Sequence, residues 1–235
     1  VLAEVIEFVK RYRRLEPLPI ELTTRVRFNS ALSQSWFGSI MEIINQITML
    51  SIILSGAALI REREHGTIEH LLVMPLRPRE IMLAKVWSTG LIVLIVSALS
   101  LTFIVQGLLH VPIEGSVLLF MLCVALHLFA TTSLGIFMAT VSRSMPQFGL
   151  LLILTLLPLE MLSGGMTPRE SMPELAQTLM LAAPTTHFTA AAQAILYRGA
   201  GFEIVWPQMA AIVLIGAIFF FLAMTRFRKT LSQLA

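Results

Sequence analysis

Residues 47–105, ITMLSIILSGAALIREREHGTIEHLLVMPLRPREIMLAKVWSTGLIVLIVSALSLTFIV, place a dense cluster of arginine and glutamate between two long apolar runs. Apolar runs of about 20 residues are typical of membrane-spanning helices, because each helix must cross a hydrocarbon core of about 30 Å. A soluble domain of this length would not contain several apolar runs of about 20 residues. The stretch therefore predicts two membrane-spanning helices joined by a loop that lies in water.

The composition of the whole chain favours the same class of protein. Of its 235 residues, 56% are hydrophobic and 13% are charged, whereas a typical soluble domain is about 25% charged. The chain has no aspartate and a single cysteine, Cys123, inside an apolar run, which excludes an intrachain disulfide framework. The net charge of +3 is only a weak sign of nucleic acid binding, and we expect no nucleic acid partner. In a membrane protein, an excess of basic residues more often reflects topology.

Hydropathy predicts an all-α polytopic membrane protein with about five transmembrane helices, since a helix satisfies its own backbone hydrogen bonds in lipid. The fourth span is short, and Pro158 followed by SGG predicts a broken outer helix. About 15 helical residues rise only roughly 22 Å, so this span either continues through Gly164 and Gly165 or enters the membrane and turns back. The predicted spans are residues 36–60, 86–109, 117–141, 148–162 and 206–225.

Basic residues in the connecting segments predict the orientation of these spans. Nine lysines and arginines fall on one side of the predicted membrane and two fall on the other. The first side comprises residues 61–85, 142–147 and 226–235, and the second comprises residues 110–116 and 163–205. The positive-inside rule places the first side, and with it the C-terminus, in the cytoplasm. Residues 1–35 would then lie outside although they carry six basic residues, because long polar segments cross with little regard to charge.

Two segments outside the spans have patterns of their own. Residues 1–35 combine a helical repeat with an alternating pattern, so we expect the end of a small extracytoplasmic α+β domain, followed by a transmembrane domain over residues 36–235. The chain starts at Val1 rather than Met, and we expect an N-terminal piece to precede it. Segment 163–205 contains two helix-like pieces, residues 174–182 and 187–197, which we expect to lie at the outer membrane interface.

Polar side chains inside the apolar runs are candidate site residues, because they are costly in lipid and tend to face protein or water. Glu42, Asn45 and Gln46 lie near the outer end of the first span, and Glu160 lies near the outer end of the fourth. One interpretation is a polar vestibule on a substrate pathway. The other is that Glu42 lies in the headgroup layer and Glu160 caps a broken helix. The sequence leaves both open.

Several catalytic patterns are absent from the sequence. It contains no GxxxxGK[ST] phosphate loop, no HExxH and no GxSxG motif, so we expect no ATP binding in this chain, no metal site and no enzyme activity. An intramembrane enzyme using Glu42 or Glu160 remains an alternative, but no nucleophile and base stand at a useful spacing. His127, in mid-span, is expected to be hydrogen-bonded and packed.

The charged loop predicts a short helix held away from the bilayer. The first span ends at Ile60, and RERE keeps the helix end in water, where its side chains can pair with each other or with a partner. Gly66 can then break the helix and Pro75 can end the next one. That helix is either an interfacial anchor or a docking element for a cytoplasmic protein. The candidate coupling residues are Glu64, Gly66, Thr67, Ile68, Glu69, Leu71, Leu72 and Pro75.

Two motifs carry a resemblance to a known family. REREHGTIEHLLVMPLRPREIMLAK (61–85) resembles the first cytoplasmic loop of ABC-2 type permeases, the membrane subunits of a class of bacterial ATP-binding cassette exporters. LPLEMLSGGMTPRESMPELAQTLMLAAPTTHFTAAAQAILYRG (157–199) is similar to that family's broken outer helix, with its spaced Pro168 and Pro173 and its closing Arg198 and Gly199. The two motifs cover some 70 residues.

The resemblance implies a permease with six spans and an extracytoplasmic domain between the first two, so this chain would lack the first span. It also implies two permease halves and two cytoplasmic ATPase subunits, with ATP and Mg on the ATPases and no cofactor in this chain. The loop helix would act as an amphipathic coupling helix. The expected location is the bacterial inner membrane. The resemblance does not identify the transported substrate. A membrane anchor or assembly factor without transport remains the alternative.

Overall fold

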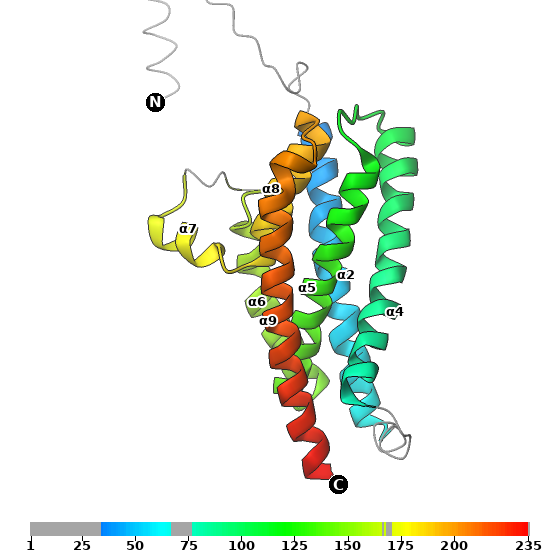
Figure 1. The fold of residues 1–235 in the computed structure, drawn as a ribbon, viewed down its shortest axis with the longest axis vertical. Helices are drawn as coiled ribbons and strands as arrows, with labels where there is room; N and C mark the ends of the chain where they lie inside the picture. Colours follow the sequence, from blue (N-terminus) through cyan, green and yellow to red (C-terminus); the bar gives the residue numbers. More distant parts are fainter. Residues whose placement is uncertain (1–33, 67–76, 166, 168–170, 235) are drawn as a thin grey trace, which may run out of the picture. The chain divides into compact units, whose positions relative to one another are not determined.

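The computed structural model describes residues 34–66, 77–165, 167 and 171–234. Within these ranges every regular element is helical, which confirms the all-α prediction. The α+β prediction lies outside these ranges except for residues 34 and 35, which belong to the first described helix, and the predicted amphipathic helix after Gly66 lies outside them as well. The elements, shown in Figure 1, are α2 (Gln34–Glu64), α4 (Pro78–Leu99), the π-helix η1 (Ser100–Leu108), α5 (Val117–Val141), α6 (Met145–Met161), α7 (Glu174–Met180), α8 (Pro184–Arg198) and α9 (Phe202–Leu234).

Four of these helices are long and apolar enough to cross a membrane, over residues 38–64, 79–108, 117–141 and 202–228. The fifth apolar helix, α6, has only 17 residues. The apolar core of each helix lies where hydropathy predicts it, and α5 begins and ends at the predicted residues. The helices α2 and α4 continue beyond their apolar parts, to Glu64 and back to Pro78.

The helix α6 differs from the prediction of a break at Pro158. It runs through Pro158 to Met161, and the amide of Leu162 still donates to the Pro158 carbonyl at 3.0 Å. The prediction was wrong because a proline only one turn from the helix end removes a single backbone bond, which the rest of the helix tolerates. The turn away from the helix occurs later, where Gly164 has a φ of 91°.

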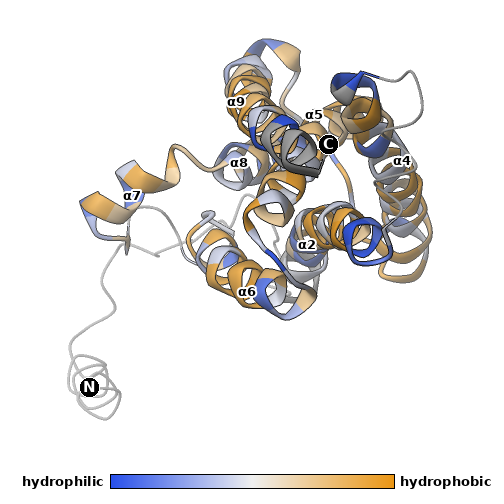
Figure 2. Ribbon diagram, turned by 90° about the horizontal axis from the view of Figure 1, so that it is seen from below, coloured by the Kyte–Doolittle hydropathy of each residue, from blue (hydrophilic) through white to orange (hydrophobic). Residues whose placement is uncertain are grey.

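The helices α2 and α5 form the centre of the described unit. In the most hydrophobic 18-residue stretch of α2 and of α5, 56% of the residues are buried, against 22% in the corresponding stretches of α4–η1 and of α9. The helix α5 packs against α2, α4, α8 and α9. The outward faces of α4, α6 and α9 carry exposed apolar side chains such as Trp87, Leu150 and Leu214, and Figure 2 shows hydrophobic residues on the outward turns of α4 and α6. Such faces suit lipid contact.

Small residues let α5 approach its neighbours closely, as small residues do in membrane helix pairs. A Cβ atom added at Gly135 would lie 2.6 Å from the Ile52 carbonyl oxygen of α2. A Cβ atom added at Gly216 of α9 would lie 3.0 Å from the Ala130 Cα of α5. The two glycines therefore set the spacing on opposite sides of the central helix.

The helix α8 lies among the other helices. Its Phe188 and Ile195 are fully buried, and it packs against both α5 and α9. This piece is therefore packed into the helical unit, and its position at the outer interface stays a prediction. By contrast, none of the residues of α7 is buried. The amide of Glu114, in the loop before α5, donates to the Leu196 carbonyl at 3.1 Å, which ties that loop to the end of α8.

Candidate functional site

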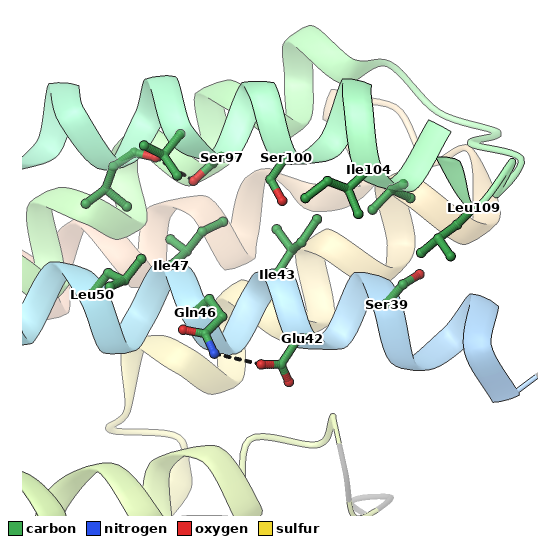
Figure 3. A pocket seen from close by; sticks show the side chains of 13 residues that line it. Ser39, Glu42, Ile43, Gln46, Ile47, Leu50, Ser97, Ser100, Ile104 and Leu109 are labelled. Atoms are coloured by element: carbon green, nitrogen blue, oxygen red, sulfur yellow. Dashed lines mark hydrogen bonds between the residues drawn. The ribbon is translucent and has the colours of Figure 1, made fainter. Parts of the chain in front are cut away.

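A cavity of about 320 Å³ lies between α2 and the continuous helix formed by α4 and η1. From α2 it is lined between Ser39 and Leu50, and from the other wall between Val93 and Val105, with Leu109 at the end. Figure 3 shows Ile43 and Ile47 pointing from α2 toward α4. Its wall is therefore mostly apolar, with serine hydroxyls as the main polar groups on the α4–η1 side.

The backbone of one cavity wall has an uncommon conformation. At Ser100 the α-helix α4 passes into the π-helix η1, whose last bond runs from the Leu109 amide to the Ile104 carbonyl at 2.9 Å. A π-helical turn is wider than an α-turn and is found mostly as single turns, frequently at functional sites. Here the widened turns carry Ser100, Ile104 and Val105 into the cavity wall.

Two of the predicted vestibule residues meet at the α2 edge of this cavity. The Gln46 Nε2 donates to the Glu42 Oε1 at 2.7 Å, one helical turn apart. Figure 3 shows both side chains on the edge of α2 away from α4. Glu42 is exposed, so its carboxylate keeps acceptor capacity beyond the bond from Gln46.

The structure brings Glu160 near this edge, whereas Asn45 takes no part in the cavity wall. Glu160 is half-buried near the end of α6, close enough to Glu42 for the two charges to act on each other. The Glu160 carbonyl accepts from the Ser163 hydroxyl at 3.0 Å. Asn45 is half-buried and lies outside the set of residues that line the cavity.

His127 of α5 and Thr48 of α2 form a second polar contact, which is buried between the two helices and confirms the packing role predicted for His127. The His127 Nε2 lies 2.9 Å from the Thr48 Oγ1. Because the Thr48 hydroxyl donates to the Ile44 carbonyl at 3.1 Å, it accepts from the His127 Nε2–H. The ring also stacks on Phe188 of α8, with centroids 4.0 Å apart and planes at 8°. Both His127 and Phe188 are fully buried.

Only part of the predicted coupling segment can be located. Glu64 is the last residue of α2, and its Oε1 accepts from the Met145 amide at 3.1 Å. Gly66 has a φ of 70°, which confirms that it ends the run of α2. The other coupling candidates lie outside the described residues; they are Thr67, Ile68, Glu69, Leu71, Leu72 and Pro75.

The arrangement of the cavity is suited to binding an apolar ligand. Among the residues that the structure describes, no three His, Cys or Glu side chains are grouped to hold a metal ion. An apolar cavity with a carboxylate and an amide at one edge can enclose an apolar ligand and orient it by a polar or charged end. Of these features, the widened η1 turn has no signal in the sequence that we can identify.

Comparison with known sequences gives a family and several relatives. The ABC-2 type transporter family pattern matches residues 15–197. The chain is 66% identical over 233 residues to the "Inner membrane transport permease YhhJ" of Escherichia coli K12, covering 99% of this chain and 62% of that relative. It is 29% identical over 230 residues to the "Probable multidrug ABC transporter permease YbhR" of the same organism, covering 95% of this chain and 62% of the relative. The chain thus spans less than two thirds of the length of either relative.

Proposed function

The chain belongs to the ABC-2 type transporter family, and from this premise we propose that it is the membrane part of an ATP-driven exporter. The observation that carries the proposal is the family match itself, since it includes both the charged loop after α2 and the outer segment that ends with α8. The helices long and apolar enough to cross a membrane support it. ATP hydrolysis would occur on a separate cytoplasmic subunit that binds ATP and Mg.

The cavity between α2 and α4–η1 is proposed as part of the substrate pathway. Its apolar wall and its size favour an apolar or amphiphilic substrate, because burying apolar area contributes roughly 25 cal/mol per Å². The Glu42–Gln46 pair offers a carboxylate oxygen to a positive or hydrogen-bond-donating end of that substrate. The name of the relative YbhR, a probable multidrug permease, is in keeping with such a substrate class.

Glu160 and Asn45 are assigned to the pathway on different grounds. The charge of Glu160 reinforces the negative potential near Glu42, which would favour a cationic substrate over an anionic one. Asn45 stands outside the cavity wall, and we assign it to the same pathway only through its position on α2. The vestibule is therefore proposed to depend chiefly on Glu42 and Gln46.

The remaining parts of the assembly are proposed by the same reasoning. A second permease half, as a homodimer or with a close paralogue, would complete the pathway. The coupling residues would be Glu64, Gly66 and those that follow, with the hydrophobic side chains after Gly66 docking on the ATPase. The protein would lie in the bacterial inner membrane, as the name of the relative YhhJ states for that protein, with its C-terminus in the cytoplasm.

ATP-dependent uptake into inside-out vesicles tests the proposal. The full-length protein is co-expressed with an ATP-binding cassette ATPase subunit, and uptake of a fluorescent lipophilic cation is compared with uptake of a neutral dye of similar size. Glu42→Gln should reduce uptake of the cation more than that of the neutral dye. Glu203→Gln, which changes an exposed glutamate at the start of α9, is the matched control and should behave as wild type.

The outcomes separate the proposal from its alternatives. A wild-type protein that takes up neither dye when ATP is added, although it binds the ATPase subunit, favours an anchor or assembly factor. Equal uptake of the cation by wild type and Glu42→Gln rejects Glu42 as a pathway residue and leaves the headgroup interpretation of its position. Loss of uptake in the Glu203→Gln control would mean that the effect of a lost charge is not specific to the cavity.

A further inference from the structure

Three consecutive residues at the end of α2 each contact a different neighbouring helix. The Lys85 Nζ of α4 forms an ion pair with the Glu62 carboxylate. Arg63 bonds to the end of α5, and Glu64 bonds to the start of α6. Their side chains are half-buried or exposed, and each contact lies where α2 ends, beside the end of α5 and the starts of α4 and α6. We call Glu62, Arg63 and Glu64 with these contacts the α2 clamp.

The Arg63 contact is a charged cap on a helix C-terminus. Its Nη1 donates to the Ser142 carbonyl at 2.6 Å and its Nη2 donates to the Ala139 carbonyl at 2.8 Å. The last carbonyls of a helix lack partners within the helix and carry partial negative charge. A guanidinium that binds two of them at once fixes their position with respect to α2, which a single flexible ammonium group would do less well.

The Glu64 contact is the opposite cap on a helix N-terminus. The Met145 amide donates to the Glu64 Oε1 at 3.1 Å, and the residue at the capping position, Ser144, makes no side-chain capping bond of its own. A carboxylate at this end is favoured by the partial positive charge of the first amides. Arg63 and Glu64 therefore hold the two sides of the turn between α5 and α6, each with the charge that suits its helix end.

The third contact joins the two ends of the charged loop. Glu62 and Lys85 lie on α2 and α4, the helices that flank that loop. Gly66, with a φ of 70°, follows directly, so the chain turns away from α2 just after the clamp. Arg61 and Glu64 are exposed, whereas Glu62 and Arg63 are half-buried. The sequence predicted that these side chains keep the helix end in water and can pair with each other or with a partner, and the contacts of the clamp are with α4, α5 and α6 of the same chain.

From these contacts we propose that Glu62, Arg63 and Glu64 are positioning residues that make the ends of α2, α4, α5 and α6 move as one body. This rests on the proposed function, in which an ATPase pushes on the loop after Gly66. Displacement of the loop would then reach the α5–α6 turn directly through Arg63 and Glu64, and not only the helices that the loop joins. Energy from ATP hydrolysis would be delivered to the whole cytoplasmic end of the helices.

Two measurements on the full-length protein in lipid nanodiscs test the clamp. The variants are Arg63→Ala and Glu64→Ala, with Arg63→Lys as the conservative change and Arg61→Ala as the matched control. In Glu64→Ala, hydrogen exchange of the Met145 amide should become about fivefold faster, because losing one helix cap makes local opening of the helix end about fivefold more favourable. The ratio of substrate transported to ATP hydrolysed, with the ATPase subunit bound, should fall in Arg63→Ala and Glu64→Ala. It should fall less in Arg63→Lys and not at all in Arg61→Ala.

A charge exchange tests the contact with α4. Glu62→Lys and Lys85→Glu should each lower the coupling ratio, and the two changes together should restore much of it. Faster exchange at Met145 with a wild-type coupling ratio in every variant would show a merely structural role and overturn the proposal. Unchanged exchange at Met145 would overturn it as well. If the wild-type protein shows no ATP-dependent transport, the proposed function is contradicted instead. The exchange of the Met145 amide in Glu64→Ala then tests the clamp contact independently of transport.

Discussion

A close contact between α2 and α5 predicts opposite changes in stability for two glycine-to-alanine variants. Gly135 of α5 faces α2, where an added Cβ atom would lie 2.3 Å from the Ser55 Oγ, 2.6 Å from the Ile52 carbonyl oxygen and 3.0 Å from the Ile52 Cα. The serine hydroxyl can rotate away, but the backbone of Ile52 cannot. Gly135→Ala therefore forces α2 and α5 apart along a contact that includes the buried polar pairs between them.

The expected magnitude combines two opposing effects. Overpacking of a well-packed core costs about 1–3 kcal/mol, and the backbone contact places this case in the upper half of that range. Alanine gains about 1 kcal/mol over glycine in a helix interior. The net loss in the free energy of unfolding is therefore about 1–2 kcal/mol. Gly90 of α4 is the matched control, because its added Cβ atom would meet only the Leu128 Cβ at 4.0 Å, so Gly90→Ala should gain up to about 1 kcal/mol.

Thermal unfolding in detergent measures both variants against wild type. A change of 1 kcal/mol shifts the midpoint by about 2–4 °C for a protein of this size, so the two variants, about 1–3 kcal/mol apart, should melt roughly 2–12 °C apart. Gly135→Ala should melt below wild type and Gly90→Ala at or above it. A Gly135→Ala protein as stable as wild type would refute the argument that the backbone of α2 fixes this contact, and equal shifts for both variants would do so too.

Three further predictions concern separate parts of the chain. Thr48→Val leaves the buried His127 Nε2 without its partner and should lower the free energy of unfolding by about 1–3 kcal/mol, measured by the same melts. Gly199→Ala should cost about 1–2 kcal/mol, because its φ of 64° is unfavourable for a residue with a Cβ atom. Ser30→Cys, in a background without Cys123, should react with an impermeant thiol reagent in intact cells. Labelling only after the cells are opened would contradict the predicted orientation.

The positions of the helices could be predicted because hydropathy reports burial in lipid or protein without any knowledge of neighbours. The clearest case is α5, whose bounds coincide with a predominantly apolar run that carries no charged residue. The prediction failed at Pro158, where the sequence signal of a helix breaker is strong. Its cost depends on how many turns follow it, and only the structure shows that α6 ends at Met161.

The contacts of the α2 clamp could not be predicted, because its partners lie far away in the chain. Arg63 binds carbonyls that are 76 and 79 residues away, and Glu64 binds an amide 81 residues away. A charged run at the end of a span has the same sequence pattern whether it faces water or caps other helices. By contrast, the Glu42–Gln46 bond spans four residues on one helix, a spacing that sequence alone places on one face.

The contacts between α2 and α5 extend from the middle of the pair to one end. In mid-span Thr48 bonds to His127, and one turn further along α2 the Ser51 Oγ donates to the Thr131 Oγ1 at 2.7 Å. Where both helices end, Arg63 holds the last carbonyls of α5. Directional bonds in mid-span and at this end, with the close backbone packing at Gly135 between them, resist sliding as well as separation.

The wall of the cavity opposite α2 is held differently. The helix formed by α4 and η1 contributes mainly apolar side chains there, with a π-helical segment beside the cavity, and much less of its apolar surface is buried than for α2 or α5. Apolar contacts are not directional, so they permit small displacements that hydrogen bonds would oppose. A cavity with one fixed wall and one adjustable wall can change its width while α2 and α5 stay paired. The Glu62–Lys85 ion pair then joins the adjustable wall to the fixed one where α2 ends and α4 begins.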